Sequence, residues 1–81
     1  MPYIKNDGRR EELEDGDVAE TCGELNFQIT KMCLNYLDFK GLSYQTLNDI
    51  IGAMAAARAE FYRRVVEPYE KKKEKENGDV F

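Results

Sequence analysis

Arg58 is the residue whose type and position most directly suggest a chemical site, because it lies inside an apolar run. On a helical wheel it falls between Val65 and Ile51 on the apolar arc. An unpaired buried arginine is costly, so a polar partner is expected. We leave two interpretations open, an anion site inside a helical bundle and a structural ion pair that fixes helix register. The partners within reach on a facing antiparallel helix would be Glu24, Asn26 and Thr30.

Cys22 is a second candidate, because it falls in the first turn of a predicted helix. The positive end of a helix dipole favours a thiolate, which is the form of a reactive or redox-sensing cysteine. The sequence contains no histidine that would act as its base, which excludes a Cys-His nucleophile. We therefore interpret Cys22 and Cys33 as structural residues and predict no catalytic residue.

Two carboxylate pairs have the spacing of metal ligands on a helix, Glu11 with Glu14 and Glu67 with Glu70. Helical nucleotide pyrophosphohydrolases bind magnesium through such pairs on adjoining helices. Here the first pair lies in a glycine-flanked segment and the second straddles Pro68, so neither faces a common core. Zinc is disfavoured further, since the chain has no histidine and no CxxC motif. We predict no metal site and no cofactor.

Basic and aromatic residues interleave near the C-terminal end, a pattern that can bind single-stranded nucleic acid. The bases are Arg63, Arg64 and the run Lys71-Lys72-Lys73. Five glutamates occupy the same stretch and would repel phosphate: Glu60, Glu67, Glu70, Glu74 and Glu76. A solvated helix face is favoured, and nucleic acid is not the expected partner.

Length and charge restrict the chain to one small domain of 81 residues with a net charge of −4. Residues 1–20 carry seven acids against three bases, which does not suit a nucleic-acid binder. Cys22 and Cys33 would lie roughly 16 Å apart along one helix, too far for a disulfide. Free thiols, together with the lack of a long apolar run or a signal peptide, indicate a cytoplasmic protein without membrane contact.

The elements that position these residues are two helices joined by a short loop. Thr21-Cys22-Gly23-Glu24 has capping-box spacing, and Gly41 has the position of a helix stop. Ser43 would cap a second helix that ends or kinks at Pro68. We predict an all-α fold with an antiparallel helical hairpin over 21–67. It is flanked by a mostly irregular acidic arm over 1–20, with one helical turn around Arg9–Glu14, and by a charged tail over 68–81.

Both predicted helices carry more apolar surface than one neighbour can cover, since a helix on one partner needs a stripe of about 100°. Leaving such surface exposed is typical of an interface. We therefore predict a homodimer in which two hairpins form a four-helix bundle. The candidate interface consists of Phe27, Leu34, Gly52, Ala56, Phe61, Tyr62 and Val65.

Several segments together resemble a family of small uncharacterised proteins of bacteriophages and prokaryotes. They are Met1-Pro2-Tyr3-Ile4-Lys5, residues 23–30 (GELNFQIT), Lys40-Gly41-Leu42-Ser43-Tyr44, residues 60–66 (EFYRRVV), Pro68-Tyr69-Glu70 and residues 77–81 (NGDVF). The resemblance spans nearly the whole chain and implies one compact unit. It implies no activity, ligand or catalytic residue.

The function that the sequence favours is a small homodimeric protein-interaction or accessory module. The first alternative is a nucleic-acid-associated regulator that uses Arg63, Arg64 and Lys71–Lys73. The second alternative is a small-molecule or metal-dependent enzyme.

Overall fold

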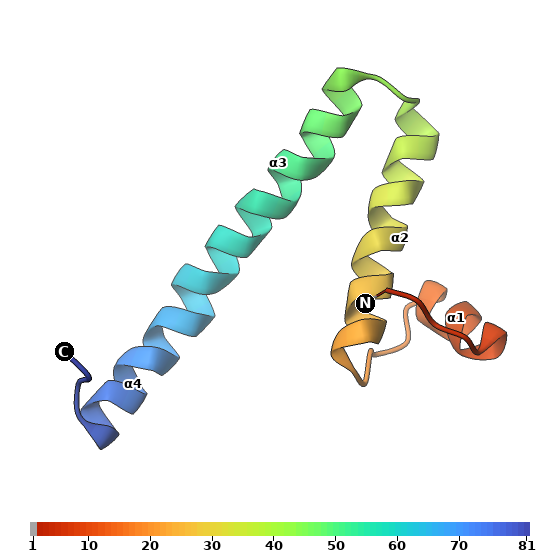
Figure 1. Cartoon of the computed structure of the whole chain (residues 1–81). Helices are drawn as coiled ribbons and strands as arrows, with labels where there is room; N and C mark the ends of the chain where they lie inside the picture. The colour runs from red at the N-terminus through yellow and green to blue at the C-terminus, as the bar shows by residue number, and fades with distance from the viewer. Residues whose placement is uncertain (1) are drawn as a thin grey trace. The chain divides into compact units, whose positions relative to one another are not determined.

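The computed structural model describes residues 2–81, and every regular element in that range is helical, which confirms the predicted all-α class. The elements in chain order are α1 (Asp7–Glu14), α2 (Cys22–Lys40), α3 (Tyr44–Phe61), the π-helical turn η1 (Tyr62–Val66) and α4 (Glu67–Asn77) (Figure 1). Met1, which begins the first segment of the resemblance, lies outside the described residues. The antiparallel hairpin and the four-helix bundle stay predictions.

The chain divides into two compact units, Met1–Leu47 and Asn48–Phe81. The first unit contains α1, α2 and the start of α3, and the second contains the rest of the chain. The predicted segments 1–20, 21–67 and 68–81 stay predictions. In the structure α1 of the acidic arm packs onto α2, and the helix continues past residue 67.

Helix α2 begins and ends where the sequence predicts. The Thr21 hydroxyl accepts a hydrogen bond from the Glu24 N–H at 3.1 Å, which satisfies one of the free donors of the first turn. At the other end Gly41 has a φ of 86°, a value that favours glycine, and its N–H donates to the Leu37 carbonyl at 2.7 Å. The first boundary therefore follows from the capping hydroxyl of Thr21, and the second from a positive φ that glycine adopts without strain.

The acidic arm is more ordered than predicted, because it contains the two-turn helix α1. The Asn6 side chain caps this helix by accepting from the Arg9 N–H at 3.1 Å. Helix α1 packs against α2 (Figure 1). Two apolar side chains are buried in this unit, Leu13 of α1 at 2% exposed and Phe27 of α2 at 7% exposed. The sequence prediction was wrong here because it did not weigh the cap and the one large apolar residue on the helix together.

The start of α3 also follows its predicted cap. The Ser43 side chain accepts from the Thr46 N–H at 3.1 Å, and the two hydroxyls lie 3.1 Å apart. Thr46 is 5% exposed, so its buried hydroxyl is satisfied by the capping serine itself. The loop between the two long helices is thus closed by a local hydrogen-bond arrangement.

Pro68 does not end the helix, because the backbone takes a π-helical turn immediately before it. The Glu67 N–H donates to the Tyr62 carbonyl, five residues back, in place of the usual four. Proline lacks the donor that an α-turn would need and its ring would meet the carbonyl of Arg64. The wider turn accommodates the ring, the dihedral angles at Phe61 and Glu67 stay α-helical, and α4 continues to Asn77.

The same glycine-to-alanine change should have opposite effects at two positions. We expect Gly41→Ala to lower the free energy of unfolding by more than about 1 kcal/mol, because alanine is strained at the positive φ of this residue. Gly52 lies inside α3, and no atom outside the local helix lies within 4 Å of the position that a Cβ would take. Gly52→Ala should therefore stabilise the chain by about 0.5–1 kcal/mol. Urea unfolding followed by circular dichroism measures both, and shifts of the same sign would contradict the assignment.

Candidate functional site

The most concentrated polar cluster in the first unit is built around the Arg9 guanidinium. Its Nε lies 3.0 Å from Glu24 Oε2 and its Nη2 lies 2.7 Å from Glu24 Oε1, which makes a bidentate pair. Nη1 donates to Asp17 Oδ2 at 2.7 Å, and Nη2 also donates to the Val18 carbonyl at 2.9 Å. The side chains of Arg9 and Glu24 are each 15% exposed. The cluster therefore joins α1, the following turn and α2 in one hydrogen-bonded arrangement.

Local structure places both partners of this pair. Arg9 stands four residues before the buried Leu13 on α1, so both side chains lie on the face that packs against α2. Glu24 occupies the first turn of α2, where its Oε1 also accepts from the Glu20 N–H at 2.9 Å. A carboxylate at this position also complements the positive end of the helix dipole.

The charges of the cluster stabilise one another. Hydrogen bonds from Arg9, and then from the Glu20 N–H, lower the pKa of Glu24 to about 2. Hydrogen bonds from Arg9 and from the Val18 N–H lower the pKa of Asp17. The same two carboxylates raise the pKa of Arg9. Glu24 is thus ionised and occupied at neutral pH, so it is not available as a general base near pH 7. We interpret the cluster as a structural clamp.

A second layer of contacts holds the turn after α1 against α2. The Gln28 amide donates to the Asp17 carbonyl at 2.6 Å and to the Leu13 carbonyl at 3.2 Å. Lys31 Nζ lies 2.9 Å from Glu14 Oε1 in a half-exposed ion pair. The Gln28 bonds join α2 to the last turn of α1 at Leu13 and to the following turn at Asp17, and the ion pair adds a third contact between the same segments.

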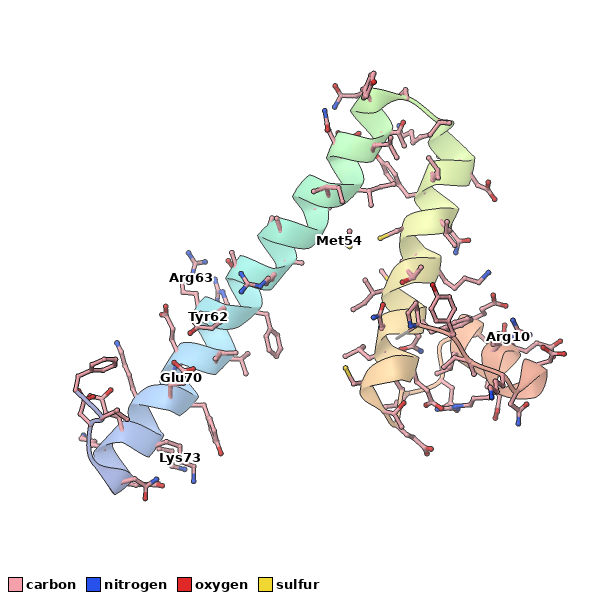
Figure 2. The ribbon with its side chains drawn as sticks, in the orientation of Figure 1. Arg10, Met54, Tyr62, Arg63, Glu70 and Lys73 are labelled. Atoms are coloured by element: carbon pink, nitrogen blue, oxygen red, sulfur yellow. The ribbon has the colours of Figure 1, made fainter. Side chains whose placement is uncertain are left out.

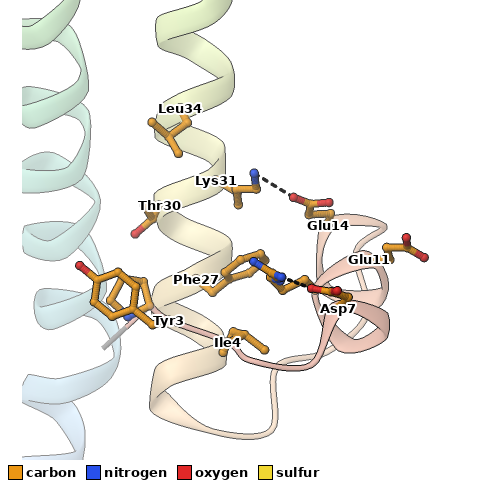
Figure 3. A pocket seen from close by; sticks show the side chains of 11 residues that line it. Tyr3, Ile4, Asp7, Glu11, Glu14, Phe27, Thr30, Lys31 and Leu34 are labelled. Carbon is orange, nitrogen blue, oxygen red and sulfur yellow. Dashed lines mark hydrogen bonds and ion pairs between the residues drawn. The ribbon is translucent and has the colours of Figure 1, made fainter.

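An open groove of about 590 Å³ lies beside this clamp, between the N-terminal residues, α1 and α2 (Figure 3). Its apolar lining includes Ile4, Phe27 and Leu34. The charged groups on its edge are two ion pairs, Asp7 with Arg10 and Glu14 with Lys31, and the carboxylate of Glu11. The groove offers apolar contact beside these ion pairs, which suits a polypeptide surface better than a small charged ligand.

The predicted site around Arg58 is distributed differently in the structure. Glu24 is bound to Arg9, and Asn26 accepts from the Thr30 hydroxyl at 3.1 Å. Arg58 lies in the last turn of α3 in the second unit, with its side chain exposed. The pairing of Arg58 with Glu24 or Asn26 stays a prediction.

The predicted interface residues divide into one buried and several exposed side chains. Phe27 belongs to the core of the first unit, where it is 7% exposed. Leu34 is 48% exposed, and the remaining three large side chains are exposed as well: Phe61 at 60%, Tyr62 at 41% and Val65 at 51%. Gly52 and Ala56 lie on α3 and are exposed.

The basic residues of the nucleic-acid alternative are partly engaged with acids. Arg63 and Arg64 both form ion pairs with Glu60. Arg63, Glu70 and Lys73 lie along the same helical column (Figure 2). Lys73 Nζ lies 3.4 Å from Glu76 Oε2 and 5.6 Å from the centre of the Tyr69 ring. This surface is a balanced ion-pair face.

Residues 2–81 contain neither a cluster of metal ligands nor a membrane-spanning helix. No group of three or more histidine, cysteine, aspartate or glutamate side chains in that range is arranged to hold a metal ion. None of the helices described has the length and apolar character needed to cross a bilayer. Neither Cys22 nor Cys33 forms a disulfide bond within the described residues.

Comparison with protein families gives one match, a domain of unknown function (DUF6899), over residues 1–80. The chain belongs to the DUF6899 family. This confirms the sequence resemblance to a family of uncharacterised small proteins, and it assigns no activity. No curated protein and no solved structure is significantly similar to this DUF6899 chain.

Sequence reasoning missed Arg9, the central residue of the clamp in this DUF6899 domain. A signal was present, because Arg9 and Leu13 are spaced to share one face of a helix that begins after Asn6. A basic residue on the same helix face as Leu13, the one large apolar residue of α1, indicates a contact with the body of the protein. Glu24 was identified as a candidate acceptor, and in the structure it accepts from Arg9 of α1.

The clamp should make folding stability depend on pH in the acid range. The folded-state pKa of Glu24 is lowered from its ordinary 4.5 to about 2, so its stabilising effect is complete above pH 4.5 and is lost as the pH falls toward 2. Glu24→Gln should reduce this pH dependence and destabilise the fold at pH 7. Urea unfolding between pH 2 and pH 7 measures it. Glu11→Gln, an exposed carboxylate on α1, is the control, and an equal effect of both variants would contradict the clamp.

Proposed function

We propose that this DUF6899 chain is a small homodimeric protein-interaction or accessory module without catalytic activity. The observation that supports it is the contrast between a minimal core and a large exposed apolar surface. Only Leu13 and Phe27 are buried among the large apolar side chains of residues 2–81. Most of the remaining large apolar residues are exposed, for example Met32 on α2, Ile51 on α3 and Tyr69 on α4.

In the first unit, the exposed apolar residues extend along α2. Met32 is 70% exposed and Phe39 is 85% exposed, with Leu25, Ile29 and Leu34 between 42% and 52%. Isolated exposed apolar residues are ordinary, but Leu25, Ile29, Met32 and Phe39 share one face of the helix and present a contiguous surface, whereas Leu34 lies on the opposite face. Such a surface is typical of a protein that binds another polypeptide.

In the second unit, one helical column carries its apolar residues without a second element of that unit to cover them. Ile51 is 63% exposed, and Phe61 and Tyr69 are each 60% exposed. Burying apolar surface stabilises by about 25 cal/mol per Å². Association therefore supplies what a chain of this length does not obtain from its own core.

The proposal includes a cytoplasmic location and an origin in phages or prokaryotes. Cys22 and Cys33 form no disulfide bond in the described residues, which supports a reducing compartment. The sequence resemblance described above supports the origin. The nucleic-acid-associated regulator is not favoured, because Arg63 and Arg64 are paired with Glu60. The metal-dependent enzyme is not favoured, because the carboxylates of residues 2–81 form no cluster that could hold a metal ion.

The oligomeric state in solution tests this proposal. Light scattering on a size-exclusion column should give a mass near twice the chain mass of 9.4 kDa across a tenfold dilution series at micromolar concentration. The apolar residues that would form the interface should then be protected from a hydrophobic dye. A stable monomer across the dilution series would contradict the homodimer. If that monomer also bound no such dye, the exposed apolar surface on which the proposal rests would be contradicted as well.

A further inference from the structure

The apolar residues of the second unit recur with the alternating three- and four-residue spacing of a coiled-coil seam. From Ile51 the steps are three, four, three and four residues, which gives a and d positions in turn. The residues at these positions are Ile51, Met54, Arg58, Phe61 and Val65, and we call them the seam. The next a or d position would be residue 68, which is a proline. The large apolar residue nearest to that position is Tyr69, one residue further along the chain.

The π-helical turn η1 supplies the one residue by which Tyr69 is late. A turn closed by five-residue hydrogen bonds contains one more residue than an α-turn, and Glu67 N–H to Tyr62 O is such a bond. Downstream residues are therefore displaced by one position relative to an uninterrupted helix. Tyr69 takes the d position that residue 68 would occupy, and the seam continues from α3 into α4. Phe61, Val65 and Tyr69 are 60%, 51% and 60% exposed.

Charge distinguishes the two units as surfaces for self-association. The first unit carries nine acids against five bases, so two copies of it repel each other. The second unit carries seven acids and seven bases, and its arginines Arg63 and Arg64 are neutralised by Glu60. Two copies of the second unit therefore approach without net repulsion.

We propose that two copies of the α3–η1–α4 helix pair antiparallel along this seam, an inference that rests on the proposed homodimer. An antiparallel pair packs an a residue of one copy against a d residue of the other, and the spacing found here meets this rule in every layer. The layers across the two copies are Ile51 with Tyr69, Met54 with Val65, and Arg58 with Phe61, each occurring twice.

The central layer explains why an arginine interrupts the apolar stripe. In the antiparallel pair each Arg58 guanidinium lies over the Phe61 ring of the other copy, where a cation–π contact replaces a carboxylate partner. A parallel pair would place Arg58 against Arg58 and bring two like charges together. Arg58 thus favours the antiparallel direction, while its aliphatic stem packs with the apolar residues beside it.

Cross-linking of paired variants tests the direction and the register. Ile51→Cys and Tyr69→Cys are made separately in a chain with Cys22→Ser and Cys33→Ala, and the two proteins are oxidised alone and mixed. The antiparallel seam predicts a disulfide-linked dimer only in the mixture. Residues 51 of the two copies would lie roughly 27 Å apart, far beyond the reach of a disulfide. Cross-linking of either variant alone would show a parallel pair and overturn the proposal.

A second measurement does not depend on the cysteine variants. We expect Arg58→Ala to raise the dimer dissociation constant at least tenfold by analytical ultracentrifugation. Arg63→Ala removes the same side chain from the opposite, polar face and should change it less than twofold. Equal effects of the two would overturn the role of Arg58.

The outcomes separate this proposal from the homodimer itself. A dimeric mass without a cross-link in the mixture would overturn the seam and leave the homodimer standing. A monomeric mass for the unmodified chain would overturn both.

Discussion

The bidentate pair between Arg9 and Glu24 joins the two helices of the first unit, and the order of its N-terminal half depends on this contact. The guanidinium also holds the turn between the helices through Asp17 and the Val18 carbonyl. Leu13 and Phe27 bury little surface by themselves. The charge-assisted hydrogen bonds of Arg9 therefore contribute a large part of the free energy that holds α1 against α2. The acidic composition of the arm is compatible with this arrangement, because the Arg9 guanidinium lies next to the carboxylates of Asp17 and Glu24.

In the second unit, the ion pairs of the helical column each join positions three or four residues apart along one helix: Glu60 with Arg63, Glu60 with Arg64, and Lys73 with Glu76. Pairs such as Glu60 with Arg63 and Arg64 contribute only tenths of a kcal/mol each at an exposed surface. An isolated helix of this kind is marginal in water, and most helical stability in proteins comes from packing of an apolar face. The exposed apolar surface that includes Phe61 and Tyr69 therefore contributes little to the stability of a single copy. It is the surface through which we propose that two copies associate.

Helix boundaries followed from the sequence wherever they depend on nearby residues. Thr21, Gly41 and Ser43 each satisfy backbone groups within four residues, and all three predictions were confirmed. Pro68 was expected to end or kink the helix, but the choice between a break and a π-helical turn depends on how the preceding turn relaxes. The Arg9–Glu24 pair joins residues fifteen positions apart, and the periodicity of α1 indicates which face Arg9 occupies but not which residue of α2 it contacts. The candidate site could thus be predicted for its acceptor, Glu24, and not for its donor.

Apolar surface shared with a second copy is the proposed source of the chain's stability. The most direct measurement is urea unfolding followed by circular dichroism at protein concentrations about a hundredfold apart. Because unfolding would be coupled to dissociation, we expect the midpoint to rise with protein concentration. A midpoint that is the same at both concentrations would contradict the shared surface, since the folded monomer would then be stable without a partner.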